Sequence, residues 1–211
     1  MGDETVSEKK RCVIVGGADI GDYARVKQYL RAGDAIVFCD SGLKPLETLG
    51  VKPALIVGYF DSHWNPHLDV ETIVLPCEKD DTDTVFAVKT MVQRGYDDFL
   101  LIGVIGARLD HTLGNVSILL YLDSLGKKAE IVDDYSEMQI VSKDEVSIED
   151  KYPFFSLLNI TGCARGITIR DAKYPLDGAE ITSEDQYGGS NEVLPGKTAK
   201  IPQRHGQTRL N

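Results

Sequence analysis

The sequence of 211 residues lacks the features that mark several large classes of protein. It has 23 Lys and Arg residues against 33 Asp and Glu, so it has no basic surplus with which to bind DNA or RNA. Its longest apolar runs, such as 99–105, are far too short to cross a membrane. The polar stretch 1–11 has no apolar segment typical of a signal peptide. We therefore expect a protein that binds neither nucleic acids nor membranes.

The sequence has only four cysteines, and their spacing matches no metal-binding or redox motif. Cys12, Cys39, Cys77 and Cys163 form no C-x-x-C pair, which argues against a zinc site or a dithiol redox site. Cys12 and Cys39 lie in apolar runs, where cysteine usually behaves as a small hydrophobic residue. This usage predicts a reduced, cytoplasmic protein.

What the sequence does contain, from residue 11 to about 135, is an alternation of apolar runs with helical patterns. The runs are rich in Val, Ile and Leu, as expected for strands covered on both faces. Apolar spacing predicts one helix from Thr82 or Asp83 to Arg94 and another over 110–125. We expect a doubly wound, mostly parallel α/β domain over 11–137. The predicted strands are 11–15, 35–39, 54–58, 72–76, 98–105 and 129–133.

The pattern changes after about residue 138, where no convincing helical period remains. Short strand-like runs are separated by turn residues, and His205-Gly206 could turn a last hairpin into 207–210. We expect a small all-β sandwich domain over 138–211. Its predicted strands are 139–142, 145–148, 154–160, 166–171 and 193–201.

Five apolar runs of the first half end in a carboxylate or a glycine cluster. Because ligands bind at the carboxyl ends of parallel strands, we expect these tails to gather on one edge of the sheet. Such an edge could hold a metal and a phosphorylated ligand. The tails are Gly16-Gly17, Asp40-Ser41-Gly42, Gly58-Tyr59-Phe60-Asp61-Ser62, Gly106-Ala107-Arg108-Leu109-Asp110-His111 and Asp133-Asp134.

Asp40, Asp61 and Asp83 are the candidate metal ligands. Mg²⁺ prefers oxygen ligands and commonly takes one or two carboxylates together with substrate phosphates. The alternative for each residue is turn or helix-cap chemistry, which also favours Asp.

Candidate phosphate-binding residues flank these carboxylates. Lys79 precedes a helix N-terminus, Arg108 offers a planar fork, and Gly16-Gly17 resembles part of a phosphate loop. Neither G-x-x-x-x-G-K-[ST] nor G-x-G-x-x-G occurs, which weakens the P-loop and dinucleotide-binding hypotheses. Asp110 could act as a base, bind a ligand amine or cap its helix, and His111 is more typical of a structural residue.

In the second half, Ser190 and Asn191 could recognise a polar heterocycle, although the residues by themselves favour a hairpin loop. Taken together, the chemistry-bearing segments resemble those of thiamine pyrophosphokinases, in the same order over nearly the whole chain. The matching segments are Asp40-Ser41-Gly42, Gly58-Tyr59-Phe60-Asp61-Ser62, Glu78-Lys79-Asp80-Asp81-Thr82-Asp83, GARLDHTLGN at 106–115, Lys173-Tyr174-Pro175-Leu176 and Ser190-Asn191-Glu192.

The resemblance implies an enzyme that transfers pyrophosphate from ATP to the hydroxyl of thiamine, giving thiamine diphosphate and AMP. It implies a nucleotide-binding catalytic α/β domain, a thiamine-binding and dimerisation β domain, and a homodimer whose active sites form where the α/β domain of one subunit meets the β domain of the other. The implied roles are Mg²⁺ binding by Asp61, Asp83 and Asp40, orientation of substrate or nucleotide by Asp110, ATP binding by Gly16, Gly17, Lys79, Arg108 and Asn115, and thiamine binding by Ser190 and Asn191.

Tyr59 departs from the family pattern, which has a metal-binding Asp at this position. A tyrosine hydroxyl does not replace a carboxylate at neutral pH. Three alternatives to the thiamine reaction stay open. A diphosphokinase for a pterin alcohol would keep the metal site and change the pocket, and an α/β scaffold protein would bind neither thiamine nor nucleotide. The third, which Tyr59 favours, is a non-catalytic protein that binds thiamine or a nucleotide. Ala107 is a smaller departure, because the family has glycine there.

Overall fold

The computed structural model describes residues 10–60, 68–76, 81–142, 144–185 and 187–202. The chain divides into two compact units, Met1–Ile140 and Val141–Asn211. The boundary expected between 137 and 138 falls inside a strand, Glu137–Gln139 (β7), which belongs to the first unit.

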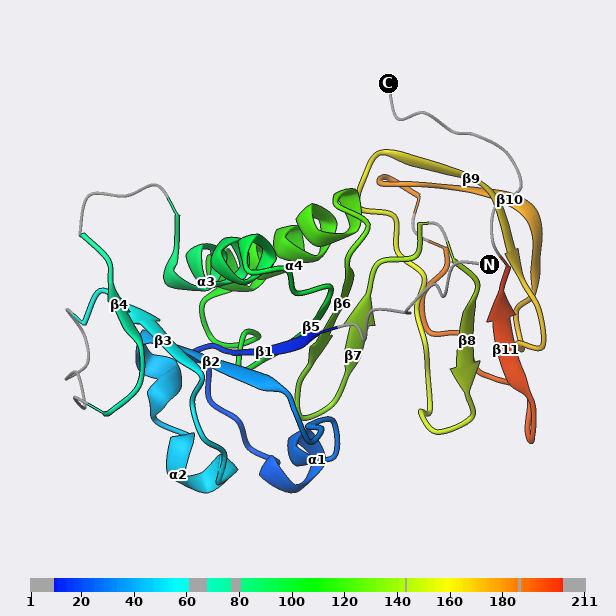
Figure 1. Ribbon diagram of the computed structural model, residues 1–211. Helices are drawn as coiled ribbons and strands as arrows, with labels where there is room; N and C mark the ends of the chain where they lie inside the picture. The colour runs from blue at the N-terminus through cyan, green and yellow to red at the C-terminus, as the bar shows by residue number, and fades with distance from the viewer. Residues whose placement is uncertain (1–9, 61–67, 77–80, 143, 186, 203–211) are drawn as a thin grey trace, which may run out of the picture. The chain divides into compact units, whose positions relative to one another are not determined.

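The first unit is built on a seven-stranded sheet with the order β4-β3-β2-β1-β5-β6-β7 (Figure 1). All neighbouring strands are parallel except β6 and β7. The doubly wound, mostly parallel sheet predicted from the apolar runs is thus confirmed. The other strands are Arg11–Val15 (β1), Ala35–Cys39 (β2), Leu55–Gly58 (β3), Thr72–Val74 (β4), Asp98–Ile102 (β5) and Lys128–Val132 (β6).

Helices cover both faces of this sheet (Figure 1). Alternate residues of β1 point to opposite cores: Ile14 packs with residues of Asp83–Gln93 (α3) and Leu109–Ser124 (α4). Val13 and Val15 pack with residues of two short helices on the other face. Burial on both faces explains why the strands lack polar alternation. The short helices are Tyr23–Lys27 (α1) and Leu46–Leu49 (α2), and a 3-10 turn, Asp40–Leu43 (η1), follows β2.

The two long helices begin and end close to the predicted residues. The Thr82 side chain caps α3 by accepting a hydrogen bond from the Val85 N–H. Gly95 and Gly126 follow α3 and α4 with φ of 82° and 70°, the left-handed conformation that glycine adopts at little cost. The strand predicted over 98–105 ends at Ile102, because Gly103 takes φ of 61° and turns the chain out of the sheet.

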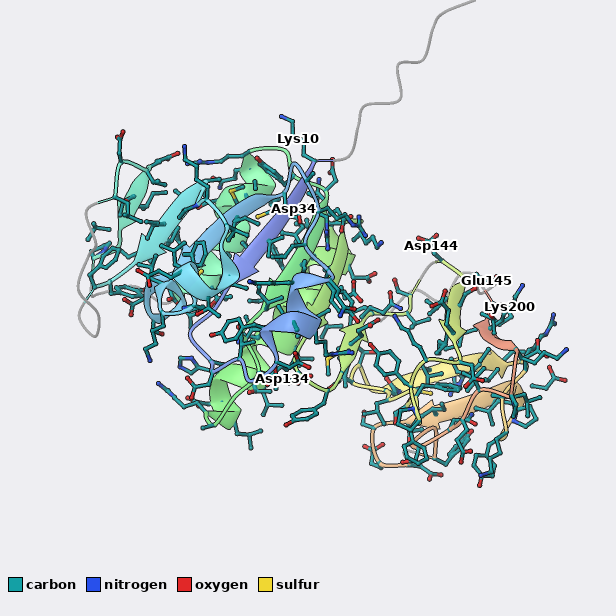
Figure 2. All side chains as sticks on the ribbon, turned by 90° about the horizontal axis from the view of Figure 1, so that it is seen from below. Lys10, Asp34, Asp134, Asp144, Glu145 and Lys200 are labelled. Carbon is teal, nitrogen blue, oxygen red and sulfur yellow. The ribbon has the colours of Figure 1, made fainter. Side chains whose placement is uncertain are left out.

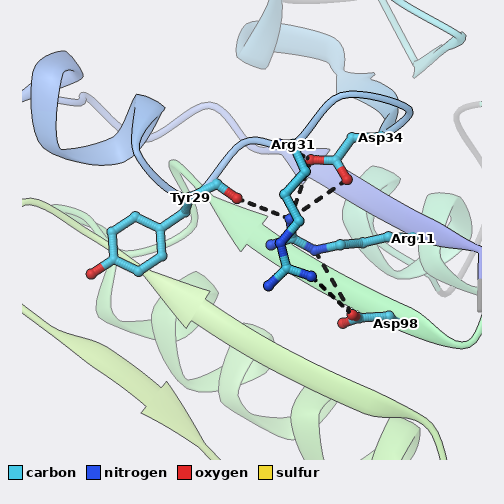
Figure 3. A network of polar contacts seen from close by, with 5 residues as sticks. All are labelled: Arg11, Tyr29, Arg31, Asp34 and Asp98. Atoms are coloured by element: carbon cyan, nitrogen blue, oxygen red, sulfur yellow. Dashed lines mark hydrogen bonds and ion pairs between the residues drawn. The ribbon is translucent and has the colours of Figure 1, made fainter. Parts of the chain in front are cut away.

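The amino ends of the strands carry an ion-pair network (Figure 3). The buried Arg11 guanidinium donates to the Tyr29 carbonyl at 2.9 Å and lies 3.3 Å from the Asp34 carboxylate. Asp98 lies 3.9 Å from Arg11 and 3.8 Å from Arg31. These contacts tie the start of β1 to the start of β5 and to the loop before β2.

Asp133 and Asp134 follow β6 at the opposite end of the strands, and Asp134 is labelled in Figure 2. Both bind main-chain groups of loops. The Asp134 carboxylate accepts hydrogen bonds from the N–H groups of Gly21 at 2.7 Å and Asp22 at 2.9 Å. Asp133 accepts from the N–H groups of Tyr135 and Ser136. Both carboxylates of this predicted ligand-binding tail are therefore engaged in loop structure.

The second unit contains two antiparallel strand pairs around a small core. Main-chain hydrogen bonds between Arg170 and Lys200 link the two pairs. Lys200 also lies 4.0 Å from Glu145, as labelled in Figure 2. The described residues of this unit include no helix, in agreement with the sequence. The pairs are Val146–Glu149 (β8) with Thr198–Ile201 (β11), and Cys163–Ile169 (β9) with Leu176–Thr182 (β10).

Two strand predictions for this half were wrong, and one strand was missed. Of the strand predicted over 193–201, only Thr198–Ile201 forms. Residues 139–142 are not a separate strand, because β7 ends at Gln139 and pairs with β6. Residues 154–160 form only an isolated bridge at Phe155, and the buried Asn159 side chain there donates to the Ile181 carbonyl. Strand β10 was missed because only one of its seven residues is buried and its register is bulged. The hairpin predicted over 207–210 lies outside the described residues.

Candidate active site

The order in which strands are added to the sheet reverses between β1 and β5. Strands β2 to β4 lie on one side of β1, and β5 to β7 lie on the other. The crevice outside the carboxyl ends of such strands is the usual ligand site of open α/β sheets. The Gly16 N–H donates to the Ile102 carbonyl at 2.9 Å, and the Ala18 N–H donates to the Gly103 carbonyl at 2.8 Å. The predicted Gly16-Gly17 loop thus lies against the loop that follows β5.

Two positions of these loops have room only for glycine, because a side chain there would collide with neighbouring atoms. A Cβ at Gly17 would lie 1.7 Å from the Ser41 Oγ, and one at Gly42 would lie 2.2 Å from the Val15 carbonyl oxygen. The glycines bring the ends of β1 and β2 together backbone to backbone, which leaves main-chain groups close to any ligand bound there.

Asp40 and Asp83 come from different elements of this edge. Asp40 begins η1 directly after β2, is 9% exposed, and has the unusual φ of 38° for a residue other than glycine. A Cβ at Gly58 would lie 3.1 Å from the Asp40 Cα, so the end of β3 packs directly against it. Asp83 is half-buried at the first position of α3, and its Oδ1 accepts the Thr84 N–H at 2.8 Å.

The charges of these two carboxylates act on the same buried thiol. Burial raises the pKa of the Cys39 thiol, and the charges of both Asp83 and Asp40 raise it further. Burial also raises the pKa of Asp83 itself, opposed by the Thr84 N–H and by the nearby His111. The His111 charge also contributes to lowering the pKa of Asp110, so this imidazole lies near carboxylates of both α3 and α4.

A divalent cation would suit this pair of carboxylates. Asp40 and Asp83 supply the hard oxygen donors that Mg²⁺ prefers, and a cation would offset the cost of holding a charge on the half-buried Asp83. Within the described ranges, no group of at least three His, Cys, Asp or Glu residues could hold a metal by itself. The third predicted ligand, Asp61, and the predicted phosphate ligand Lys79 lie outside these ranges.

Arg108 and Asp110 form an exposed ion pair at the start of α4. The Arg108 Nη2 donates to Asp110 Oδ2 at 2.6 Å, and Nε donates to Oδ1 at 3.3 Å. The hydrogen bond from Arg108 lowers the pKa of Asp110, which makes this carboxylate a weak base. The N-cap residue Arg108 makes no capping hydrogen bond to the first turn of α4, whose N-terminal end lies beside this ion pair.

Asn115 has a structural contact inside this loop. Its side chain is 8% exposed, and its amide nitrogen donates to the Val104 carbonyl at 2.8 Å. The residue therefore fixes the segment between β5 and α4 that carries Arg108.

Tyr59, which departs from the family pattern, is turned toward the loop before α3. Its hydroxyl donates to the Asp81 carbonyl at 2.6 Å, and its ring packs against the core below α3. Lys89 of α3 reaches both carboxylate oxygens of Asp81, at 2.9 and 2.7 Å. These contacts could not be predicted from the sequence, since the spacing of 22 residues between Tyr59 and Asp81 follows no local pattern.

In the second unit, Ser190 and Asn191 differ in what they do. Asn191 is 3% exposed, and its side chain accepts from the Tyr174 N–H at 3.0 Å and donates to the Tyr174 carbonyl at 2.8 Å. Ser190 is exposed with φ of 53°. Asn191 thus helps to hold the shape of a small pocket, and Ser190 lies in the chain between two of the residues that line it, Gly189 and Asn191. The pocket is lined by Ile169, Tyr174, Leu176, Tyr187, Gly188, Gly189 and Asn191.

Comparison with protein families decides what this arrangement represents. A family model described as the thiamin pyrophosphokinase catalytic domain matches residues 26–132. A second model, the thiamin pyrophosphokinase vitamin B1 binding domain, matches residues 137–206. The chain belongs to the thiamin pyrophosphokinase family.

Individual relatives agree with this family assignment. The thiamine pyrophosphokinase of Bacillus subtilis (strain 168) is 27% identical over 163 residues, which cover 74% of this chain and 76% of the relative. The Bacillus subtilis crystal structure has a TM-score of 0.80 at 25% identity, covering 93% of this chain and 95% of that one. These relatives support an enzyme of the thiamine diphosphokinase class.

The shared fold extends to more distant members of the family. The crystal structure of yeast thiamin pyrophosphokinase has a TM-score of 0.72 at 16% identity, over 93% of this chain and 84% of that one. In the described ranges of this chain, no helix has the length and apolarity needed to cross a bilayer.

Proposed function

We propose that this protein transfers pyrophosphate from ATP to the hydroxyl of thiamine, giving thiamine diphosphate and AMP. The observation that carries the proposal is the match of both family domains, in order, together with the two carboxylates and the glycine loops gathered at the switch point of the sheet. The thiamine hydroxyl attacks the β-phosphorus of ATP in line, and AMP leaves.

The chain contributes positioning and charge to this reaction. Asp40, Asp83 and Asp61 would hold Mg²⁺, which when bound neutralises charge on the phosphate oxygens. Arg108 is the described cation best placed for a phosphate, and ATP would replace Asp110 on its guanidinium. Asp110, freed in this way, would orient the substrate or the nucleotide. Gly17 and the first turn of α4 would offer main-chain N–H groups to the phosphates, while Gly16, whose N–H donates to the Ile102 carbonyl, would let the loop approach them closely.

Thiamine would be bound through its two ends. Its cationic thiazolium suits the acidic edge of the sheet. Its aminopyrimidine would contact Ser190 in the second unit, with Asn191 keeping the pocket in shape. We further propose that the protein is a homodimer, because the second unit exposes the large apolar side chains of Phe154, Leu158 and Ile160, at 58%, 56% and 49%.

The test is AMP release from Mg-ATP with and without thiamine. Release that depends on thiamine supports the proposal. A competing hydroxymethylpterin distinguishes a pterin diphosphokinase, which would release AMP with the pterin and not with thiamine. Binding of thiamine without AMP release would support a non-catalytic protein, which the replacement of a carboxylate by Tyr59 also favours.

A further inference from the structure

Asp81 is held by two different parts of the first unit. The Tyr59 hydroxyl donates to its main-chain carbonyl at 2.6 Å. The Lys89 ammonium donates to its carboxylate oxygens at 2.9 and 2.7 Å. The main chain of Asp81 is thus tied to the end of β3, and its side chain is tied to the second turn of α3.

Both anchors are themselves well placed to resist movement. Tyr59 directly follows the last residue of β3, and its ring packs against the buried core. A tyrosine side chain has only two χ angles, so a packed ring carries its hydroxyl to a fixed place. Lys89 is half-buried, and its amine forms a charge-assisted hydrogen bond, which is stronger than a neutral one.

The residues that follow Asp81 lead straight to the candidate metal site. Thr82 caps α3 through the Val85 N–H at 3.3 Å, and its carbonyl accepts the Phe86 N–H at 2.9 Å. Asp83 comes next, and its carboxylate is fixed by the Thr84 N–H. A shift of Asp81 would therefore move the turn that aims the Asp83 carboxylate.

We propose that Tyr59 is a positioning residue: with Lys89 it braces Asp81 and so fixes the first turn of α3 and the Asp83 carboxylate. The inference rests on the proposed function only in giving Asp83 its role as a Mg²⁺ ligand. Tyr59 replaces an expected metal-binding Asp in the sequence. In this proposal it still affects the metal site, because it holds the main chain of Asp81.

The test compares Tyr59→Phe, which keeps the ring and removes the hydroxyl, with Tyr121→Phe on the exposed side of α4 as a control. Amide hydrogen exchange at Val85 and Phe86 should become about 3- to 10-fold faster in Tyr59→Phe, the effect of losing one hydrogen bond. Exchange in β1 should not change. Unchanged exchange at Val85 and Phe86 would overturn the brace.

The positioning role is measured by Mg²⁺ binding, without turnover. The Mg²⁺ concentration that gives half of the maximal thermal stabilisation should rise about 3- to 10-fold in Tyr59→Phe and stay unchanged in Tyr121→Phe. Lys89→Met should act in the same direction, and Lys89→Arg should retain most of the wild-type behaviour. If Mg²⁺ stabilises all variants equally, or does not stabilise the wild type, the positioning role is wrong. Failure of the proposed function appears separately, as absence of thiamine-dependent AMP release in the wild type.

Discussion

Gly16 and Gly103 approach each other so closely that a Cβ at position 16 would lie 2.5 Å from the Gly103 carbonyl oxygen. The converse also holds, since a Cβ at Gly103 would lie 2.8 Å from the Gly16 carbonyl oxygen. Both contacts are with main chain, which cannot rotate away as a side chain can. The crevice at the switch point of the sheet therefore depends on a pair of glycines that lie far apart in the sequence.

Gly16→Ala should destabilise the protein by about 1–3 kcal/mol, the usual cost of overpacking, and should lower activity because the loops at the crevice separate. Gly114→Ala is a matched control: Gly114 lies in α4, and a Cβ there would meet nothing within 4 Å. This change should be neutral or stabilise the protein by up to about 1 kcal/mol, because alanine favours helices. Urea unfolding of both variants makes the comparison, and equal stabilities would contradict the close contact.

Asp83→Asn should lower turnover by on the order of 100-fold, as expected when a group that organises transition-state charge is removed. Without Mg²⁺, the same variant should be more stable than the wild type at neutral pH. Burial raises the pKa of Asp83 above its ordinary 3.8, so the stability linked to its protonation is present at low pH and is lost as the pH rises through the raised pKa.

The measurement for Asp83→Asn is a set of thermal melts in chelator from acid to neutral pH. The gain in stability should shrink as the pH falls toward the ordinary pKa of the carboxyl group. Asp69→Asn, at an exposed position, is the control and should change neither the melts nor the turnover. If Asp83→Asn is less stable than the wild type at neutral pH, the burial of the charged Asp83 carboxylate does not destabilise the protein.

Neighbouring residues 190 and 191 should respond differently to truncation. Asn191→Ala should destabilise the protein by about 1–3 kcal/mol, because it leaves the N–H and carbonyl of Tyr174 without their buried partner. Ser190→Ala should leave unfolding unchanged and raise the KM for thiamine. Unfolding curves and thiamine saturation curves for both variants test this separation. A Ser190→Ala enzyme with wild-type KM would remove that hydroxyl from the thiamine site.

Leu158→Glu should weaken the proposed homodimer by about 10-fold or more, since it places a charge among exposed apolar side chains. Light scattering at micromolar concentration should show a dimer for the wild type and a monomer for the variant. Lys151→Glu, which lies in the same unit, is a charge control and should remain dimeric. A fully active wild-type monomer would rule out an active site shared between subunits.

The sequence by itself determined the layered α/β domain and its order before the all-β half. Runs such as 11–15 and 35–39 lack polar alternation because both faces of the sheet are covered, and this pattern is local. The helix ends near Gly95 and Gly126 were equally local, because glycine alone adopts their left-handed φ easily. The ordered motifs also determined the family.

Only the tertiary structure decided how the site residues are used. Asp134 was expected at a ligand edge, yet it holds the N–H groups of Gly21 and Asp22. Asn115 and Asn191 are predicted to bind ligands, and the structure shows in addition that their amides bind main-chain groups. Tyr59 reaches Asp81 across 22 residues. Such contacts depend on which segments the order of the strands brings together. The sequence position of a polar side chain therefore does not show whether the side chain binds a ligand or another part of the chain.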